Sequence, residues 1–271
     1  MEAFYIPSAS GNLAVVYHRP EAGEWHVRDL LFVHGFAHEH SIARPILASL
    51  WRRLACEGVG VVSVDLPGCG DSAGEFEDAT WESWLAAIST AYRWLGDRSS
   101  RPIHVGGLRL GAALALESAA ELEPESILLL QPVIRGVEMM TQFLRMRVAF
   151  SGLRGEVLEK ETTQKLRTRI AAGEKLEVGG YLLSPELAIA IDGIELCAQT
   201  PPTRPAIHWI ETGKDISPAT RETEEVWKAY GNHVSLALVD VKPYWVYSRG
   251  LVPEYGPLAD AVANVFADGP S

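Results

Sequence analysis

Short runs of apolar residues alternate along this chain with longer segments of helical periodicity. The runs have the continuity of strands buried on both faces, and they lie at 30–33, 59–64, 102–105, 127–130, 206–211 and 234–241. Between them, apolar residues recur three or four positions apart, which predicts helices at 41–56, 78–95, 110–122, 219–230 and 258–266. This alternation is typical of a mostly parallel sheet covered by helices on both faces.

The alternation breaks off between residues 132 and 204. This stretch holds an amphipathic segment at 138–150, a strongly charged one at 159–172, a hairpin or strand pattern at 175–183 and a helical one at 185–196. Structureless loops of such length are rare in compact domains. We therefore expect residues 1–131 and 205–271 to form one core, and residues 132–204 to form a helical cap inserted into it.

The composition is that of a folded globular protein with a net negative charge. Of 271 residues, 47% are hydrophobic and 22% charged, and 35 acidic side chains outnumber 24 basic ones to give a net charge of −11. A net anion has no general attraction for nucleic acid or an anionic membrane, so we expect neither as a partner. No apolar run approaches the ~18 residues of a membrane span, and the first residues lack the pattern of a secretory signal. These features predict a cytoplasmic protein.

Cysteine and histidine spacing predicts no metal site. The cysteines Cys56, Cys69 and Cys197 are odd in number and widely spaced, which indicates neither a disulfide framework nor a zinc site. The histidines of Ala37-His38-Glu39-His40 have a spacing that metal sites use, but a loop without a third ligand nearby favours a solvated turn. We therefore expect no metal and no cofactor.

Several motifs stand where strands of the predicted sheet end. Gly107 to Gly111, of sequence GLRLG, joins a strand to a helix as the nucleophile elbow G-x-S-x-G does. His34-Gly35 follows an apolar strand, as in the loop that supplies an oxyanion donor. Asp65 to Ser72 matches the turn D-x-P-G-x-G-x-S common in α/β hydrolases, and Asp215 follows the strand 206–211 where that superfamily places its acid. In this order the motifs predict the α/β-hydrolase fold.

The catalytic chemistry of that superfamily is not carried over with the motifs. The elbow residue is Arg109, whose guanidinium stays protonated and cannot attack a carbonyl. The loop after the last strand, 242–248, contains no histidine, and His233 precedes that strand. A catalytic triad acts as a unit, and only its acid position, Asp215, is still filled. We expect Asp215 and Arg109 to be remnants of a catalytic site without standard serine-hydrolase activity.

One family shares these departures. The elbow GLRLGA at 107–112, the loop His34-Gly35-Phe36 and the run Pro243-Tyr244-Trp245 after the last strand resemble the second α/β-hydrolase family associated with the exosortase A system. The resemblance extends over roughly the whole chain, although Tyr244 stands where the family is expected to have phenylalanine. It implies a cytoplasmic bacterial protein that belongs with exopolysaccharide and protein-sorting gene clusters. Because members are hydrolases by fold, the resemblance implies no particular reaction.

Arg109 has two interpretations. Beside the backbone N–H groups of a helix N-terminus, including that of Leu110, its guanidinium would bind a carboxylate or a phosphate through two hydrogen bonds. Alternatively, it pairs with Asp215 or another acid and holds the altered site together. For the first interpretation we expect the ligand to be bound by His34, Gly35, Phe36, Arg109, Leu110, Tyr244 and Trp245.

Other candidate side chains have structural explanations as well. His34 serves this fold mainly through its backbone, although its imidazole could act as a base. Ser72 and Cys69 are alternative nucleophiles for which turn interactions are the simpler explanation. Tyr244 and Trp245 either stack against a sugar or acyl group or fill the space of the missing histidine. An apolar face of the cap indicates core packing or an acyl-binding lid, and comprises Met139, Met140, Phe143 and Met146.

Three functions are compatible with the sequence. The first is binding of a small anionic, acyl or carbohydrate ligand without standard catalysis. The second is an active hydrolase or acyltransferase that uses a non-standard nucleophile or a water held by Arg109. The third is a protein-interaction subunit that acts through the cap, as a homodimer or with another protein. The sequence favours the first, because a guanidinium can bind but cannot attack.

Overall fold

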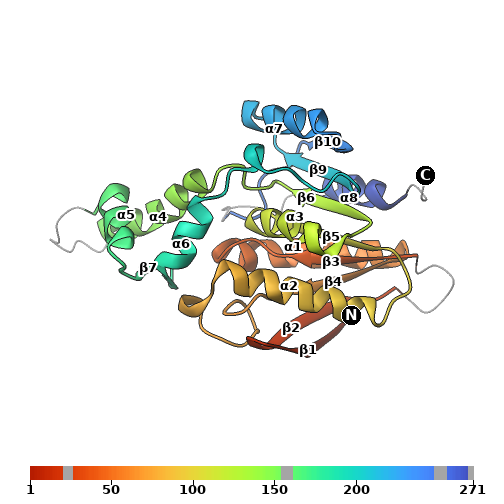
Figure 1. Ribbon diagram of the computed structural model, residues 1–271, viewed down its shortest axis with the longest axis horizontal. Coiled ribbons are helices and arrows are strands. Elements are labelled where there is room, and N and C mark those ends of the chain that lie inside the picture. The colour runs from red at the N-terminus through yellow and green to blue at the C-terminus, as the bar shows by residue number, and fades with distance from the viewer. Residues whose placement is uncertain (21–26, 154–160, 247–254, 268–271) are drawn as a thin grey trace.

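An eight-stranded sheet forms the centre of the molecule in the computed structural model, which describes residues 1–20, 27–153, 161–246 and 255–267 (Figure 1). The strands are β1 Glu2–Ser8, β2 Gly11–His18, β3 Arg28–Val33, β4 Val59–Val64, β5 Ile103–Leu108, β6 Ser126–Leu130, β9 Ala206–Thr212 and β10 Val234–Val239. They lie in the order β1-β2-β4-β3-β5-β6-β9-β10. Strand β2 pairs antiparallel with β1 and β4, and the six strands from β4 to β10 pair parallel. This confirms the predicted α/β-hydrolase fold.

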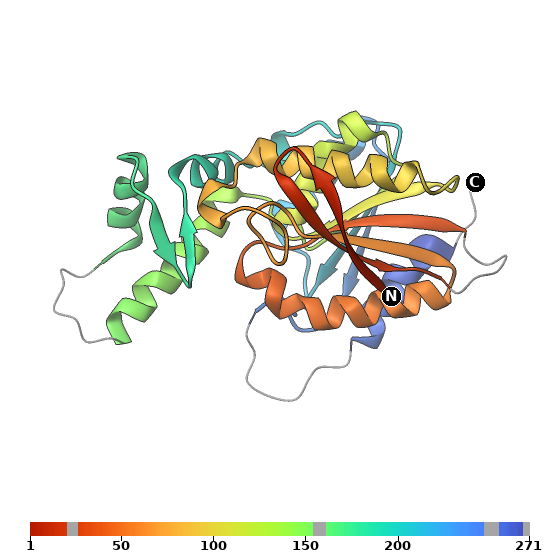
Figure 2. The ribbon, with the colours of Figure 1, turned by 90° about the horizontal axis from the view of Figure 1, so that it is seen from below.

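Helices cover both faces of the sheet, as Figure 2 shows. One face carries α1 His38–Cys56 and α8 Gly256–Ala267, and the other carries α2 Trp81–Gly96, α3 Leu110–Leu122 and α7 Pro218–Ala229. Two apolar cores result, one on each side. Successive side chains of a strand point to opposite faces, so Leu31 and Val33 of β3 pack with α2 and α3, whereas Leu30 and Phe32 pack with α1 and α8.

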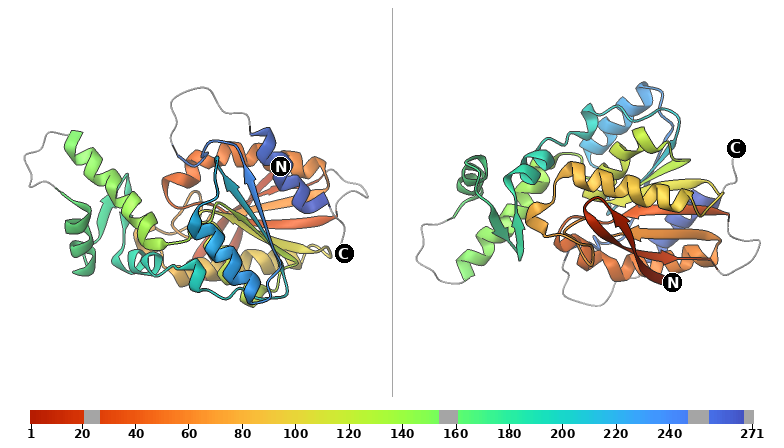
Figure 3. Two further views of the ribbon diagram at one scale, coloured as in Figure 1. Left: turned by 90° about the horizontal axis from the view of Figure 1, so that it is seen from above. Right: turned by 60° about the horizontal axis from the view of Figure 1, so that its bottom comes forward.

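The chain between β6 and β9 forms a smaller layer that stands off one end of the sheet (Figures 1 and 3). Its elements are α4 Gly136–Leu153, α5 Thr163–Ala171, the hairpin of β7 Leu176–Val178 and β8 Tyr181–Leu183, α6 Pro185–Asp192 and the 3-10 helix η2 Leu196–Ala198. Ring contacts join it to the rest of the fold: Phe143 lies 5.0 Å from Phe36, and Tyr181 lies 5.1 Å from Phe76. The insertion therefore packs over the loops that follow β3 and β4.

The apolar face of α4 is part of the core. Met139, Met140 and Phe143 are buried, and Met146 packs against them. Core packing, the first of the two explanations considered from the sequence, accounts for these side chains. No helix in the described ranges combines the length and the hydropathy that crossing a bilayer requires.

The structure departs from the predicted elements at several places. It adds β1 and β2, which were not predicted from the sequence; in β1, an edge strand, buried and exposed positions alternate, as at Ile6 and Tyr5. The helix predicted at 185–196 ends at Asp192, and a short 3-10 turn follows. Helix α1 begins at His38, three residues before the predicted start at Ser41. The third difference changes the candidate site.

Candidate functional site

The turn between β5 and α3 has the shape of a nucleophile elbow. Arg109 at its tip has φ 56° and ψ −115°, a conformation that L residues rarely adopt and that typically carries ~1–3 kcal/mol of strain. The flanking glycines permit it: a Cβ on Gly107 would lie 2.2 Å from the backbone of Gly111, and one on Gly111 would lie 2.3 Å from the carbonyl oxygen of His34. The GLRLG pattern thus keeps the sharp turn although its central residue is no nucleophile.

Arg109 is held by a carboxylate from α1. Its Nε lies 3.2 Å from Oε1 of Glu39, and the two side chains are only 15% and 9% exposed. The other oxygen of Glu39, Oε2, accepts a hydrogen bond from the backbone N–H of Phe36 at 3.4 Å. The guanidinium also lies over the ring of Trp245, with Cζ 5.3 Å from the ring centre. Glu39 therefore ties the elbow to the loop that follows β3.

The partner of Arg109 is this other acid and not Asp215. Asp215 lies exposed in the turn after β9, and no ion pair joins it to Arg109 in the described part of the chain. Strand β9 ends at Thr212, and the turn that follows it, which contains Asp215, is exposed to solvent. Glu39 carried no signal in the sequence, because its segment was expected to be a solvated turn rather than the first turn of α1.

A second buried carboxylate, Glu211, lies at the end of β9. Its Oε1 accepts hydrogen bonds from Nε1 of Trp209 at 2.7 Å and from Oγ1 of Thr220 at 3.3 Å, and its Oε2 accepts one from Nε2 of Gln131. Burial raises the pKa of Glu211, and these hydrogen bonds and the charge of Arg109 only partly offset it. In the sequence Glu211 is only the last residue of a predicted strand, so its place as an acid in the site could not be recognised there.

A cavity of about 190 Å³ lies between Arg109, the end of β9 and the start of the insertion. Its polar lining residues are Arg109, Gln131, Arg135, Glu138, Gln142, Glu211, Ser217 and Thr220. Of the guanidinium nitrogens of Arg109, only Nε is bonded to a described residue. Nη1 and Nη2 have no partner among the described residues.

His34, His40 and Asp65 form a buried cluster next to the elbow. The rings of His34 and His40 lie 4.5 Å apart, and Nε2 of His40 lies 3.1 Å from Oδ1 of Asp65. Burial, followed by repulsion from His40, lowers the pKa of His34 to about 3, so its imidazole is neutral and weakly basic at pH 7. The expected solvated turn at His38 and His40 is wrong, because α1 begins early and turns His40 inward onto Asp65.

The turn after β4 supplies no nucleophile. Oγ of Ser72 donates to the carbonyl oxygen of Asp65 and accepts from the backbone N–H of Ala14, so its turn role is confirmed. Burial, with a smaller effect of the nearby Asp65 carboxylate, raises the pKa of the Cys69 thiol to about 12. The thiol is therefore protonated at neutral pH, and a protonated thiol is a poor nucleophile.

Tyr244 and Trp245 are buried in the core on the α1 and α8 side, with their rings 5.1 Å apart in a T-shaped arrangement. The hydroxyl of Tyr244 has no hydrogen-bond partner in the described ranges, and burial raises its pKa. Both rings are buried after β10, and neither is among the residues that line the cavity beside Arg109. The rest of that loop, from residue 247 and including Ser248, lies outside the described residues.

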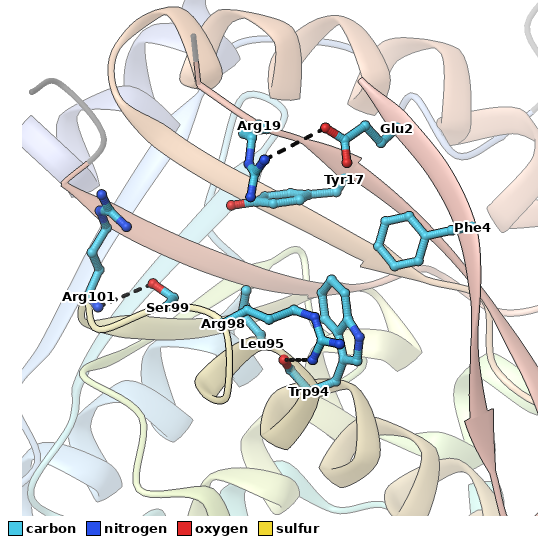
Figure 4. A pocket seen from close by; sticks show the side chains of 9 residues that line it. All are labelled: Glu2, Phe4, Tyr17, Arg19, Trp94, Leu95, Arg98, Ser99 and Arg101. Carbon is cyan, nitrogen blue, oxygen red and sulfur yellow. Dashed lines mark hydrogen bonds and ion pairs between the residues drawn. The ribbon is translucent and has the colours of Figure 1, made fainter. Parts of the chain in front are cut away.

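A second cavity, of about 280 Å³, lies at the other end of the parallel strands (Figure 4). There Oη of Tyr17 and Oγ of Ser99 donate to the two oxygens of Asp29, at 3.0 and 2.6 Å, where β3 begins. The rings of Phe4 and Trp94 lie 5.0 Å apart on its wall. Its lining residues come from β1, from β2 and the residue after it, and from the end of α2 and the loop that follows, so it is separate from the elbow.

Solved structures of low sequence identity share the fold. Est1E from Butyrivibrio proteoclasticus, solved with ferulic acid, has a TM-score of 0.68 at 18% identity over 97% of this chain and 98% of its own. A serine hydrolase homologue from Coxiella burnetii has a TM-score of 0.58 at 12% identity over 97% and 94%. A thermophilic esterase from Thermogutta terrifontis, solved with malate, has a TM-score of 0.54 at 18% identity over 89% and 90%.

Sequence comparison identifies the family but no close relative. No curated protein matches the sequence. The sequence model of the alpha/beta hydrolase family matches residues 30–263, which include the elbow, both loops of the candidate site and β9. The chain therefore belongs to the alpha/beta hydrolase family.

Proposed function

We propose that this protein binds a small anionic ligand, of acyl or carbohydrate type, in the cavity beside Arg109, without standard serine-hydrolase catalysis. The observation that carries the proposal is the guanidinium itself. Glu39 holds it at the tip of the elbow by Nε, and Arg109 is one of the residues that line the polar cavity, with no described partner on Nη1 or Nη2. Two parallel N–H groups of this kind match the oxygens of a carboxylate or a phosphate.

The surroundings of Arg109 support an oxygen-rich ligand. The guanidinium precedes the N-terminus of α3, whose positive dipole end favours an anion. Gln131, Ser217 and Thr220 line the same cavity with groups that both donate and accept hydrogen bonds, as sugar hydroxyls require. Gln131 also has a positive φ of 45°, and strained residues of this kind cluster at functional sites.

The residues around the elbow argue against the standard mechanism. Arg109 cannot attack a carbonyl, and the last histidine of the sequence, His233, precedes β10. The neutral imidazole of His34, with a pKa of about 3, is too weak a base to activate a hydroxyl at pH 7. The acid position Asp215 is exposed. The family fold is thus kept as a scaffold for binding.

We further propose that residues 132–204 act as a cap on this cavity, with residues 1–131 and 205–271 as the core. The first residues of the insertion, among them Val133, Met139 and Gln142, line the cavity next to Arg109. The resemblance of the elbow, the His34–Phe36 loop and the Pro243–Trp245 run supports a place in the bacterial cytoplasm, in an exopolysaccharide and exosortase context. There the ligand would be an acylated or sugar intermediate.

Ligand binding is tested with malate, ferulate and inorganic phosphate as probes. Malate and ferulic acid are carboxylic compounds bound to two of the structural neighbours. Calorimetric titration and melting temperature are measured for wild type and Arg109→Ala, with Arg98→Ala, which lines the other cavity, as the matched control. We expect a ligand-dependent rise in Tm in wild type and Arg98→Ala but not in Arg109→Ala. Equal shifts in all three proteins, or none with any probe, would contradict the proposal.

An active hydrolase or acyltransferase is the second candidate, and the retained strain at Arg109 favours it. In that case Arg109 would hold the attacking water or polarise the substrate carbonyl. A panel of acyl esters, thioesters and phosphoesters separates the two functions. Turnover that disappears in Arg109→Ala supports the enzyme, whereas no turnover, or equal traces in both proteins, supports binding alone.

A third candidate, a protein-interaction subunit, is favoured by exposed apolar side chains on the insertion. Val137 and Ile189 are 46% and 61% exposed there. Size-exclusion chromatography with light scattering, on wild type and Ile189→Asp, tests whether this surface joins two copies. A dimer that becomes a monomer in the variant supports self-association, and a monomer in both contradicts it.

A further inference from the structure

Two histidines and an aspartate converge where β3 and β4 end, outside the cavity beside Arg109. His34 follows β3, Asp65 follows β4, and His40 lies in the first turn of α1. One side-chain donor atom from each lies within 4.8 Å of the other two, and all three residues are buried. The proposed ligand site makes no use of this cluster.

Donor atoms within the cluster lack hydrogen-bond partners. Nδ1 of His34 is buried and has no partner among the described residues. Nε2 of His40 lies 3.1 Å from Oδ1 of Asp65, a close pair whose direction falls short of a well-aligned hydrogen bond. Nearly all buried polar side-chain atoms find a partner, so the unpaired Nδ1 of His34 calls for a physical reason.

A shared cation would supply the partner. Zinc binds histidine nitrogen and carboxylate oxygen at about 2.0–2.2 Å, so two ligands on one tetrahedral ion lie about 3.4 Å apart. The distance of 3.1 Å between His40 and Asp65 is close to this spacing. A donor that starts 4.8 Å away has to approach by only about 1.4 Å to complete the set.

We propose that His34, His40 and Asp65 bind one divalent transition-metal ion. Two imidazoles and one carboxylate are a donor set that suits zinc and its neighbours, whereas calcium and magnesium prefer oxygen. Nη1 of Arg44 lies 3.6 Å from Oδ2 of Asp65, where it holds the carboxylate in place while its charge opposes the ion. The site adjoins Glu39 in the chain, so a bound ion would stiffen the helix turn that holds Arg109. The proposal does not depend on ligand binding in the cavity.

The experiment measures metal binding by the purified full-length chain after treatment with a chelator. Zn²⁺ is titrated by calorimetry, and Co²⁺ is followed by visible absorption, which reports the coordination of the ion. We expect one ion per chain in wild type. Loss of an outer partner of a metal ligand already weakens binding by about 10–100-fold, so His40→Ala and Asp65→Asn, which remove ligands, should lose at least as much.

His38→Ala is the matched control, because His38 lies two residues away on the same helix turn but outside the cluster. It should bind the ion as wild type does. Circular dichroism verifies that each variant is folded. If a cluster variant does not fold, the wild-type Co²⁺ spectrum decides the question: strong bands of a tetrahedral complex, displaced by one equivalent of Zn²⁺, support the site. Absence of binding in wild type, weak bands of a fully hydrated ion, or equal affinity in wild type and both folded cluster variants would overturn it.

Discussion

Breaking the contact between Glu39 and Arg109 is expected to destabilise the protein strongly. Glu39→Ala leaves the guanidinium, 15% exposed, without its carboxylate partner. Removing one member of a buried ion pair typically costs about 3–5 kcal/mol, because the remaining charge stays desolvated. Arg109 keeps some contact with solvent and with the field of Glu211, so we expect the lower end, about 3 kcal/mol. For a chain of this length that corresponds to a fall in Tm of roughly 6–12 °C.

Urea unfolding, followed by tryptophan fluorescence, measures this change in wild type, Glu39→Ala, Arg109→Leu and the double variant. The double variant removes both charges, so it should recover part of the loss, with a coupling free energy of about 1 kcal/mol or more. Asp215→Ala is the control: the carboxylate is exposed and does not pair with Arg109, so its effect should stay within about 0.5 kcal/mol. Additive losses in the cycle, or a loss in Asp215→Ala as large as in Glu39→Ala, would refute the reasoning.

Three further predictions concern the rest of the fold. Burial, together with nearby positive charge, lowers the pKa of His104 to about 4, so mainly the unfolded state takes up its proton between pH 6.5 and 4. The contribution of this group to stability is therefore complete above pH 6.5 and is lost as the pH falls to 4. His104→Gln should flatten that part of a curve of Tm against pH. An unchanged slope would mean that other groups cause the pH dependence. Gly111→Ala would place a Cβ 2.3 Å from a backbone carbonyl oxygen and should prevent stable folding, whereas Gly256→Ala, with nothing within 4 Å, should change Tm little. The exposed Cys56 should react with a disulfide reagent at pH 8 much faster than Cys69, whose thiol has a pKa of about 12; a fast phase that survives Cys56→Ser and disappears in Cys69→Ser would contradict this order.

The sheet and the elbow could be predicted from the sequence because their determinants are local. A strand buried on both faces needs an unbroken apolar run such as 127–130 in β6, and a sharp crowded turn needs glycines at Gly107 and Gly111. Strand β1 could not be recognised in this way, because an antiparallel edge strand with one exposed face leaves only a short alternating pattern.

The contacts of the elbow residue could not be predicted from such local patterns. Arg109 could be recognised as an unusual elbow residue, and the absence of a histidine after the last strand is visible in the sequence. Its partner could not be foreseen, because the choice between Asp215 and Glu39 depends on where β9 ends and where α1 begins. A shift of three residues at the start of α1 turned a supposed solvated loop into a buried segment.

By itself, then, the sequence determined the alternation of parallel strands and helices, and it shows an arginine at the elbow and no histidine after the last strand. Only the tertiary structure decided which charges face one another: Glu39 with Arg109, Glu211 with the cavity, and His34 and His40 with Asp65. Glu39 and Arg109, for example, are 70 positions apart along the chain. They come together because parallel strands end at one edge of the sheet. Short-range periodicity encodes the elements, whereas side-chain contacts across that edge depend on packing that no local pattern contains.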